Sequence, residues 1–490
     1  MARKLKILIA SPEVAPFAKT GGLADVAGAL PKALERLGHE VRVILPKYAM
    51  VDRGSFPQVK VLDRLSLPIS DRSVDSALYE TKMGQGIPVY LLDNDSYYNR
   101  PELYRTSEGD YPDNAERFIY FSKAVPEVAK RVGFQPDCIH CNDWQTGLVP
   151  LFLRTLYRDD PYFARTGTLF TVHNLAYQGL FWHYDWPMLG IEWEYFTPEG
   201  IEFFGHINLL KAGIVYAQII NTVSKTYSQE IQTPEFGHGL DGILRARGKD
   251  LFGIVNGIDY DEWSPSVDKW IAAHYDDRHL EGKVTCKKDL LQEFGLPFHS
   301  DWPVLGVISR LASQKGFDLL ADIMEDLLER DLFFILLGTG DQLYHDLFEG
   351  IAKRFPEKAG ICLGFDNSLA HKIEAGSDMF LMPSRYEPCG LNQLYSLKYG
   401  TIPIVRSTGG LADTIRNYNP RTRKGNGFSF KEYSSAKLLH AIDRALSLYG
   451  DRRKWKTLMK SAMQEDYSWD VSAQQYLKLY EKVQRKRIAG

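Results

Sequence analysis

Short β-rich runs alternate with helical stretches along almost the whole chain, and this alternation limits the possible folds more than any other feature. The chain begins with KILIAS (6–11), continues with GLADVAGALPKALERLGH (22–39) at helical spacing, and then reaches EVRVILPKY (40–48). A strand, a helix and a second strand in this order form a βαβ unit with parallel strands. The sequence therefore predicts a doubly wound α/β fold.

The same pattern occurs twice. After further strand-like runs such as GTLFTVHN and QIINTVS, the polar stretch that follows VNGIDYDEW interrupts it up to about Asp289, and PVLGVISRL and FFILLGTGD begin it again. A length of 490 residues also exceeds what one hydrophobic core usually organises. We expect two Rossmann-like domains, 1–257 and 258–468, followed by a helix over 469–490, with a ligand between the domains.

Composition excludes several classes of protein. The 59 Lys and Arg nearly balance the 62 Asp and Glu, so no chain-wide charge favours nucleic acid. The start MARKLK precedes too short an apolar run for a secretory signal, and no run approaches the length of a membrane span, so we expect a cytoplasmic protein without a membrane partner. The five scattered cysteines, with one CxxC at Cys138 and Cys141, indicate neither a disulfide framework nor a zinc site.

A glycine pair occurs in nearly the same context in each half, as KTGGLAD (19–25) and STGGLAD (407–413). In both copies the glycines open a helix, and the amides of a helix start favour anions. Lys19 precedes the first copy, and Arg310 and Lys315 follow a predicted strand of the second half. These cations, with the amides of Gly21 and Gly22, predict a site for a diphosphate.

The segment SRYEPCGLNQLYSLKYG (384–400) adds a carboxylate to this chemistry. Glu387 follows a predicted strand, and Gly390 begins a predicted amphipathic helix whose first amides would also accept phosphate. A carboxylate accepts hydrogen bonds from sugar hydroxyls. The combination is typical of a site for a sugar joined to a diphosphate.

These motifs, together with SPEVAPFAKTGGLADVAGALPKAL, CNDWQT, TVHNLAYQG, VNGID and SRLASQKG, resemble those of the bacterial glycogen synthases, a family that includes the plant starch synthases. The motifs are ordered along nearly the whole chain. The resemblance implies the GT-B fold, with two Rossmann-like domains facing across a cleft and the C-terminal helix crossing back to the N-terminal domain. It implies transfer of glucose from ADP-glucose to the non-reducing end of an α-1,4-glucan, with retention of configuration.

The resemblance also implies roles for individual residues. Lys19, Arg310 and Lys315 would bind the diphosphate, Glu387 the glucose hydroxyls, and the main-chain carbonyl beside His173 would support the developing cation. Glu13 and Asp143 would face the glucan acceptor, and the base is left unassigned. The remaining predicted substrate-binding residues are Gly21, Gly22, Asp25, Asn256, Phe365, Cys389, Gly390 and Leu391.

The sequence departs from many relatives at two places. Many relatives have His where Asn142 or Gln145 stands, which weakens a proton-transfer role for that loop. Phe365 stands where relatives often have a Tyr that stacks on adenine, so an aromatic face remains and a hydroxyl is lost. The donor preference, ADP-glucose alone or also UDP-glucose, stays open, as does the oligomeric state.

Each alternative function would require a different cofactor, set of cations or sequence motif. An α-glucan phosphorylase would need pyridoxal phosphate, which we do not expect, and a silent glucan-binding relative would not need the cations. A dinucleotide oxidoreductase is suggested only by GTGDQL at Gly338, which is not a full GxGxxG at a first βα turn. Asp93 and Asp95 spell the DxD of metal-dependent glycosyltransferases, but we expect a metal-independent enzyme.

Overall fold

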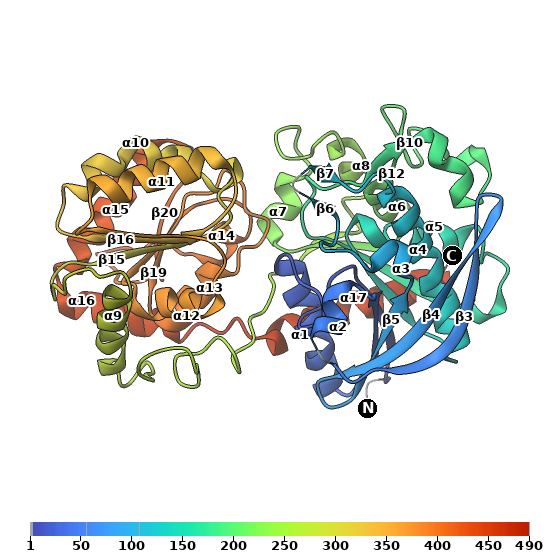
Figure 1. Ribbon diagram of the computed structural model, residues 1–490, viewed down its shortest axis with the longest axis horizontal. Coiled ribbons are helices and arrows are strands. Elements are labelled where there is room, and N and C mark those ends of the chain that lie inside the picture. The colour runs from blue at the N-terminus through green and yellow to red at the C-terminus, as the bar shows by residue number, and fades with distance from the viewer. Residues whose placement is uncertain (1–2, 55, 107, 490) are drawn as a thin grey trace. The chain divides into compact units, whose positions relative to one another are not determined.

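The chain divides into two α/β units, and the second is inserted into the first. The structure is a computed structural model that describes residues 3–54, 56–106 and 108–489. The first unit comprises Met1–Gly257 and Trp469–Gly490, and the second comprises Ile258–Ser468 (Figure 1). Met1, Ala2 and Gly490, where the predicted first domain begins and the predicted terminal helix ends, lie outside the described residues.

The first unit is built on a nine-stranded sheet. Its order is β14-β13-β9-β8-β1-β2-β5-β4-β3, and all neighbouring strands pair in parallel except β5 with β4 and β4 with β3. The strands are β1 (Lys6–Ala10), β2 (Glu40–Pro46), β3 (Val59–Ile69), β4 (Arg72–Met83), β5 (Ile87–Asp93), β8 (Cys138–Asn142), β9 (Gly167–Val172), β13 (Ile219–Thr222) and β14 (Leu251–Gly253). Because β1 has β2 on one side and β8 on the other, the chain changes direction of winding at β1, where open α/β sheets bind ligands.

Helices and short strands complete the first unit. Its helices are α1 (Gly22–Arg36), α2 (Ala49–Arg53), α3 (Asp95–Tyr98), α4 (Asn114–Arg131), α5 (Val149–Arg154), α6 (Leu209–Tyr216), α7 (Lys225–Glu230), α8 (Asp241–Ala246) and α17 (Trp469–Ala489). The short strands are β6 (Arg105–Thr106), β7 (Gly109–Asp110), β10 (Leu180–Trp182), β11 (Glu202–Phe203) and β12 (His206–Asn208). One continuous apolar core joins the sheet to α1, α4 and α17.

A ring of buried hydrogen bonds, closed through the backbone of α17, fixes this last helix of the chain on the sheet of the first unit. The Tyr480 hydroxyl donates to Nδ1 of His140 at 2.9 Å, and Nε2 of His140 donates to Oγ1 of Thr171 at 2.7 Å. Thr171 donates in turn to Asn221, whose Nδ2 donates to the Tyr476 hydroxyl at 3.4 Å. The ring therefore crosses β8, β9 and β13 and returns to α17 one helical turn from its origin.

The second unit has a six-stranded sheet in which every neighbouring pair is parallel, in the order β17-β16-β15-β18-β19-β20. The strands are β15 (Val304–Ile308), β16 (Phe333–Gly338), β17 (Ala359–Leu363), β18 (Met379–Met382), β19 (Ile402–Arg406) and β20 (Phe428–Phe430). β15 is the first strand of this sheet in the chain, with β16 and β17 on one side of it and β18, β19 and β20 on the other, so the winding changes direction between β15 and β18.

Helices cover both faces of this second sheet (Figure 1). They are α9 (Glu281–Glu293), α10 (Phe317–Leu328), α11 (Gln342–Arg354), α12 (Asn367–Gly376), α13 (Asn392–Tyr399), α14 (Gly409–Thr414), α15 (Ser435–Tyr449) and α16 (Arg452–Met463). Alternate residues of β16 point to opposite faces: Phe334 and Leu336 join the core under α10 and α15, whereas Phe333 and Ile335 join the core under α9 and α12. This is why the strand reads as a continuous apolar run in the sequence.

No helix in the described part of the chain is both long enough and apolar enough to cross a membrane. All five cysteines are free thiols in the structure. Cys138 and Cys141 lie buried on β8, where burial raises the pKa of both thiols. Both are therefore core residues of the first sheet.

Candidate active site

In the second unit, the loops after β15 and β18 bring Lys315 and Glu387 together. The Lys315 ammonium lies 2.7 Å from Oε2 of Glu387, and the Ser384 hydroxyl donates to the same oxygen at 3.0 Å. Glu387 is only 6% exposed. A buried carboxylate held by a cation and a hydroxyl is fixed in direction, which suits recognition of a polar ligand.

Backbone contacts hold these two loops together. Nε2 of Gln314 donates to the carbonyl of Tyr386 at 3.1 Å, and the Arg385 amide donates to the carbonyl of Gln314 at 2.8 Å. Gly316 has a φ of +76°, and a Cβ added there would lie 2.1 Å from the Pro383 carbonyl oxygen. Only glycine permits this close approach.

The segment after Glu387 differs from the prediction in where its helix begins. We predicted a helix that begins at Gly390, but α13 begins at Asn392, and Gly390 has a φ of +72°. A left-handed residue cannot continue an α-helix, so Cys389, Gly390 and Leu391 form the turn before it. Asn392 anchors this turn because its Nδ2 donates to the carbonyl of Ile308, the last residue of β15, at 2.7 Å.

The second glycine pair, Gly409 and Gly410, packs against the backbone of this turn. A Cβ on Gly409 would lie 1.9 Å from the Glu387 carbonyl oxygen, and one on Gly410 would lie 2.0 Å from that of Cys389. The Gly410 amide donates to the carbonyls of Glu387 and Pro388, at 3.1 Å each. The prediction that this amide faces an anion is therefore wrong: it supports the backbone on which Glu387 stands.

Two further predicted residues lie on exposed loops of the second unit. Arg310 follows β15 by two residues and is exposed, and Phe365, between β17 and α12, is 87% exposed. Such exposure excludes core packing as the role of the Phe365 ring. The nearby glycines of GTGDQL are explained by packing, because a Cβ on Gly338 or Gly340 would lie 2.1 or 2.2 Å from a carbonyl oxygen of the loop after β15.

In the first unit, Glu13 organises the first glycine loop. Its carboxylate accepts hydrogen bonds from the Thr20 amide at 2.5 Å, the Thr20 hydroxyl at 2.7 Å, the Gly21 amide at 3.3 Å and the Tyr104 hydroxyl at 2.8 Å. Glu13 is 4% exposed. The side chain that we predicted to face the acceptor thus holds the loop that we predicted to bind the diphosphate.

Gly21 has no structural reason within the protein to be glycine. Its φ of −158° is extended, and an added Cβ would meet no atom of the described residues within 4 Å. Gly22 begins α1 beside it, and both glycines are exposed. This open, side-chain-free surface is what close approach of a ligand to the backbone requires.

Beside this loop, Lys19 and Asp25 form an ion pair at 2.6 Å. Burial raises the pKa of Asp25, and Lys19 opposes that rise. Both side chains are partly exposed, so the pair adds little to stability and leaves Lys19 available to another anion.

Asp143 and His173 meet at the ends of the neighbouring strands β8 and β9. The His173 amide donates to Oδ1 of Asp143 at 2.7 Å, and the His173 Nε2 donates to Oδ1 of Asn142 at 2.9 Å. Burial lowers the pKa of His173 to about 3, so its ring is neutral near pH 7. Burial raises the pKa of Asp143 to about 7, although the His173 amide counteracts it. Asp143 therefore fixes the backbone at His173.

Asn256, after β14, completes the polar residues at this edge of the first sheet. It is 4% exposed, and its Oδ1 has no hydrogen-bond partner among the described residues. A buried acceptor without a partner is rare, and a ligand hydroxyl would satisfy it. The DxD residues have local roles instead: Asp93 lies 3.2 Å from Lys47, Asn94 caps α3, and Asp95 opens that helix.

Sequence reasoning missed several supporting residues. Thr20, Tyr104, Ser384 and Asn142 each bind a predicted site residue, and Asn392 anchors the turn of Cys389, Gly390 and Leu391 to β15. Four of them lie within the motifs that we quoted, so proximity to a motif was a usable signal. Tyr104 had no such signal, because it is 91 positions from Glu13.

Comparisons with known proteins test the fold and the family resemblance. Residues 6–246 match the family model described as starch synthase catalytic domain, and residues 291–461 match glycosyl transferases group 1. A glycogen synthase of Koribacter versatilis is 48% identical over 483 residues, with 99% of each chain covered, and one of Thermosipho africanus is 50% identical over 489 residues, covering 99% of this chain and all of that one. The structure of the catalytic domain of starch synthase IV from Arabidopsis thaliana, bound to ADP and acarbose, superposes with a TM-score of 0.91 at 33% identity, covering 99% of this chain and all of that one. The predicted GT-B fold class and the predicted family resemblance are thereby confirmed.

Proposed function

The chain belongs to the family of bacterial glycogen synthases and plant starch synthases, and from this membership we propose that it transfers glucose from ADP-glucose to the non-reducing end of an α-1,4-glucan, with retention of the anomeric configuration. Membership itself makes the chain a glycosyltransferase with nucleotide-sugar and glucan substrates. The proposal adds the identity of the donor, the linkage and the stereochemistry.

The observation that carries the proposal is the Lys315–Glu387 pair at the point where the second sheet changes direction. A nucleotide sugar presents a diphosphate next to a ring of hydroxyl groups. A cation and a carboxylate side by side match these two parts, with Lys315 toward the diphosphate and Glu387 toward the hydroxyls. A protein that only binds glucan would have no use for the cation.

The chemistry needs stabilisation of charge at two places. When the anomeric C–O bond breaks, negative charge develops on the departing diphosphate and positive charge on the sugar. In the proposal, Lys19, Arg310, Lys315 and the open backbone at Gly21 and Gly22 stabilise the diphosphate. The main-chain carbonyl beside His173 supports the sugar cation.

Retention follows from a displacement on one face of the sugar. The acceptor hydroxyl attacks from the side that the diphosphate leaves, and its proton passes to the departing phosphate oxygen. No side-chain base is required for this step. Fixed cations and amides can take the place of a divalent metal, so we propose that the reaction needs neither a metal nor pyridoxal phosphate.

The adenine nucleotide is the preferred donor in this proposal. The starch synthase structure that superposes on this chain is described as bound to ADP, the nucleotide that ADP-glucose releases. Phe365 offers an exposed aromatic face for stacking on a base, but it has no hydroxyl to distinguish one base from another. UDP-glucose, as a second or alternative donor, is therefore the main alternative.

The test is incorporation of labelled glucose into glycogen by the purified protein, with ADP-glucose and UDP-glucose compared in the presence of a chelator. Activity with ADP-glucose supports the proposal, and equal activity with both donors would restrict it to the reaction type. Dependence on a divalent metal would contradict the metal-independent reaction and favour a metal site at Asp93 and Asp95. Absence of transfer from either donor, by folded protein, would favour a silent glucan-binding relative. We also propose a cytoplasmic location, which cell fractionation tests.

A further inference from the structure

A cavity of about 420 Å3 lies in the second unit, at the opposite end of its sheet from the Lys315–Glu387 pair. Asp378, which lines the cavity, directly precedes β18, whereas the Glu387 loop follows that strand. Ser300 and Asp301, also at the cavity, precede β15. The cavity and the proposed donor site are therefore distinct places at opposite ends of β15 and β18.

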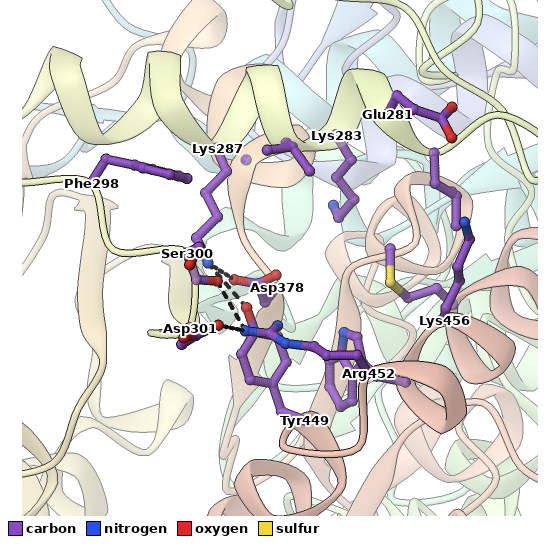
Figure 2. Close-up of a pocket in the computed structure, with 15 residues that line it drawn as sticks. Glu281, Lys283, Lys287, Phe298, Ser300, Asp301, Asp378, Tyr449, Arg452 and Lys456 are labelled. Carbon is purple, nitrogen blue, oxygen red and sulfur yellow. Dashed lines mark hydrogen bonds and ion pairs between the residues drawn. The ribbon is translucent and has the colours of Figure 1, made fainter.

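Basic side chains from two helices surround this cavity (Figure 2). Lys283 and Lys287 reach it from α9, and Arg452 and Lys456 reach it from α16. The volume falls within the range of small-molecule sites, which is roughly 300 to 1,000 Å3. The cavity is thus large enough for a metabolite.

Two of the four cations are neutralised within the protein. Lys287 lies 2.7 Å from Asp378, and Arg452 lies 3.1 Å from Asp301. One terminal nitrogen of Arg452 also donates to the Ser300 carbonyl at 2.9 Å, and its guanidinium lies over the Tyr449 ring, 4.0 Å from the ring centroid, so this cation is held in place at the cavity.

The other two cations outweigh the one remaining carboxylate, Glu281. Lys283 is buried and donates to the Ala375 and Tyr399 carbonyls, at 3.0 Å each, and to the Thr401 hydroxyl at 2.7 Å. These are neutral acceptors, and burial lowers the pKa of Lys283 to about 8, so it still carries its charge near pH 7. Lys456 is exposed at the rim. The cavity therefore has a net positive charge.

A separate observation indicates a missing acceptor. Trp455, which also lines the cavity, is 3% exposed, and its Nε1 has no hydrogen-bond partner among the described residues. Burial of an N–H without an acceptor is costly, and native structures rarely leave one. A ligand oxygen in the cavity would satisfy it.

The remaining walls are apolar. Phe298 and Val284 are 41% and 52% exposed, and Leu280 and Met459 also line the cavity. Figure 2 shows Phe298 across the cavity from Lys456. A bare inorganic anion would leave this apolar surface uncovered, whereas an organic body would bury it.

We propose that this cavity is a binding site for a small organic phosphate whose phosphate group meets Arg452, Lys456 and the Trp455 N–H and whose apolar or ring-shaped body lies against Phe298. A phosphate supplies several strong acceptors and up to two negative charges, which matches the two cations and the Trp455 N–H at this cavity. The site is separate from the proposed transferase reaction and does not depend on it.

Phenyl phosphate, inorganic phosphate and phenol are the probes, titrated calorimetrically into the full-length protein at low ionic strength. Phenyl phosphate should bind more tightly than either of the other two, because only it carries both parts. Trp455→Phe keeps a ring and removes the N–H, and we expect about tenfold weaker binding. Lys456→Glu changes an exposed residue and should weaken binding at least as much.

Lys315→Ala is the matched control, because it removes a cation from the proposed donor site and should leave phenyl phosphate affinity unchanged. Loss of binding in Lys315→Ala, with binding retained in Trp455→Phe and Lys456→Glu, would place the probe in the donor site and overturn the proposal. Equal affinity for inorganic phosphate would overturn the assignment to an organic ligand. No measurable binding at millimolar phenyl phosphate would overturn the site itself. Circular dichroism and the thermal midpoint establish that each variant is folded.

Discussion

The Lys315 ammonium lies 2.7 Å from the Glu387 carboxylate, although 72 positions separate the two residues in the chain. They meet because β15 and β18 are neighbours in the sheet and end at the same edge. The pair holds the charges of both residues in fixed directions. Such preorganisation lowers the cost of stabilising charge during the reaction.

Glu387→Gln should reduce turnover by roughly 100-fold or more while the protein stays folded, because a neutral amide neither fixes Lys315 nor accepts sugar hydroxyls as strongly. Ser384→Ala is the control: it removes one hydroxyl donor to the same carboxylate and leaves its charge in place. We expect a much smaller loss for Ser384→Ala. The measurement is initial rate against donor concentration, and equal losses in the two variants would remove Glu387 from the reaction.

Gly21→Ala should leave the thermal midpoint unchanged and weaken binding of the nucleotide sugar, because the new Cβ meets no protein atom and would stand where we propose the diphosphate approaches. Gly410→Ala should do the opposite and destabilise the second unit by roughly 1 to 3 kcal/mol, since its Cβ would collide with the Cys389 carbonyl. Thermal unfolding and donor affinity are measured for both. A Gly21→Ala protein with native donor affinity would contradict the assignment.

Glu13→Gln should raise the KM for the donor more than the KM for glucan. The carboxylate accepts four hydrogen bonds from the glycine loop and Tyr104, and an amide would present one oxygen and an unwanted donor to the same groups. Tyr104→Phe removes only one of these bonds and should have a milder effect. If the KM for glucan alone rises in Glu13→Gln, the carboxylate faces the acceptor as the sequence first indicated.

Tyr480→Phe should destabilise the first unit by about 1 to 3 kcal/mol, because it leaves Nδ1 of the buried His140 without a donor. Tyr476→Phe is matched in chemistry and position on α17 but breaks a longer hydrogen bond of 3.4 Å, so it should cost less. Urea unfolding of both variants compares them directly. Equal free energies of unfolding for the two variants would show that the hydrogen bonds of the ring add nothing to the stability that comes from packing.

Acid should weaken the first unit through His140. Burial, with a smaller effect of His173, lowers the pKa of His140 to about 3 from an ordinary value of 6.5. The unfolded chain then takes up the proton first as the pH falls, so the stability from neutral His140 is complete above about pH 6.5 and is lost toward pH 3. The difference in thermal midpoint between the native protein and His140→Gln should therefore shrink from about pH 7.5 to about pH 5. A constant difference would contradict this.

The sequence predicted the sheets well because their strands are buried on both sides and read as unbroken apolar runs. Central parallel strands form from KILIAS, GTLFTVHN and FFILLGTGD. The polar residues at the ends of these strands lie at one edge of each sheet. The pattern of apolar residues is a local property of the chain, so it could be read without a structure.

Contacts between segments that are distant in the sequence could not be predicted in the same way. The sequence could not distinguish glycine for backbone packing, as at Gly410, from glycine for ligand approach, as at Gly21, because the difference lies in what surrounds the missing Cβ. Nor could it place Gly390 before the helix, since a φ of +72° depends on the turn that Asn392 anchors. The cavity beside Trp455 likewise combines segments from 280 to 459.

The ring that joins Tyr476 and Tyr480 to the first sheet has a consequence for biosynthesis. Domains usually fold in the order in which they leave the ribosome, the N-terminal one first. Here the first unit cannot finish in that order, because its last helix is translated after the whole of Ile258–Ser468. The inserted unit has all of its strands before then and can mature earlier. A nascent chain would therefore carry an incomplete N-terminal half. The face of its sheet that α17 covers would stay exposed until a chaperone or α17 itself covered it.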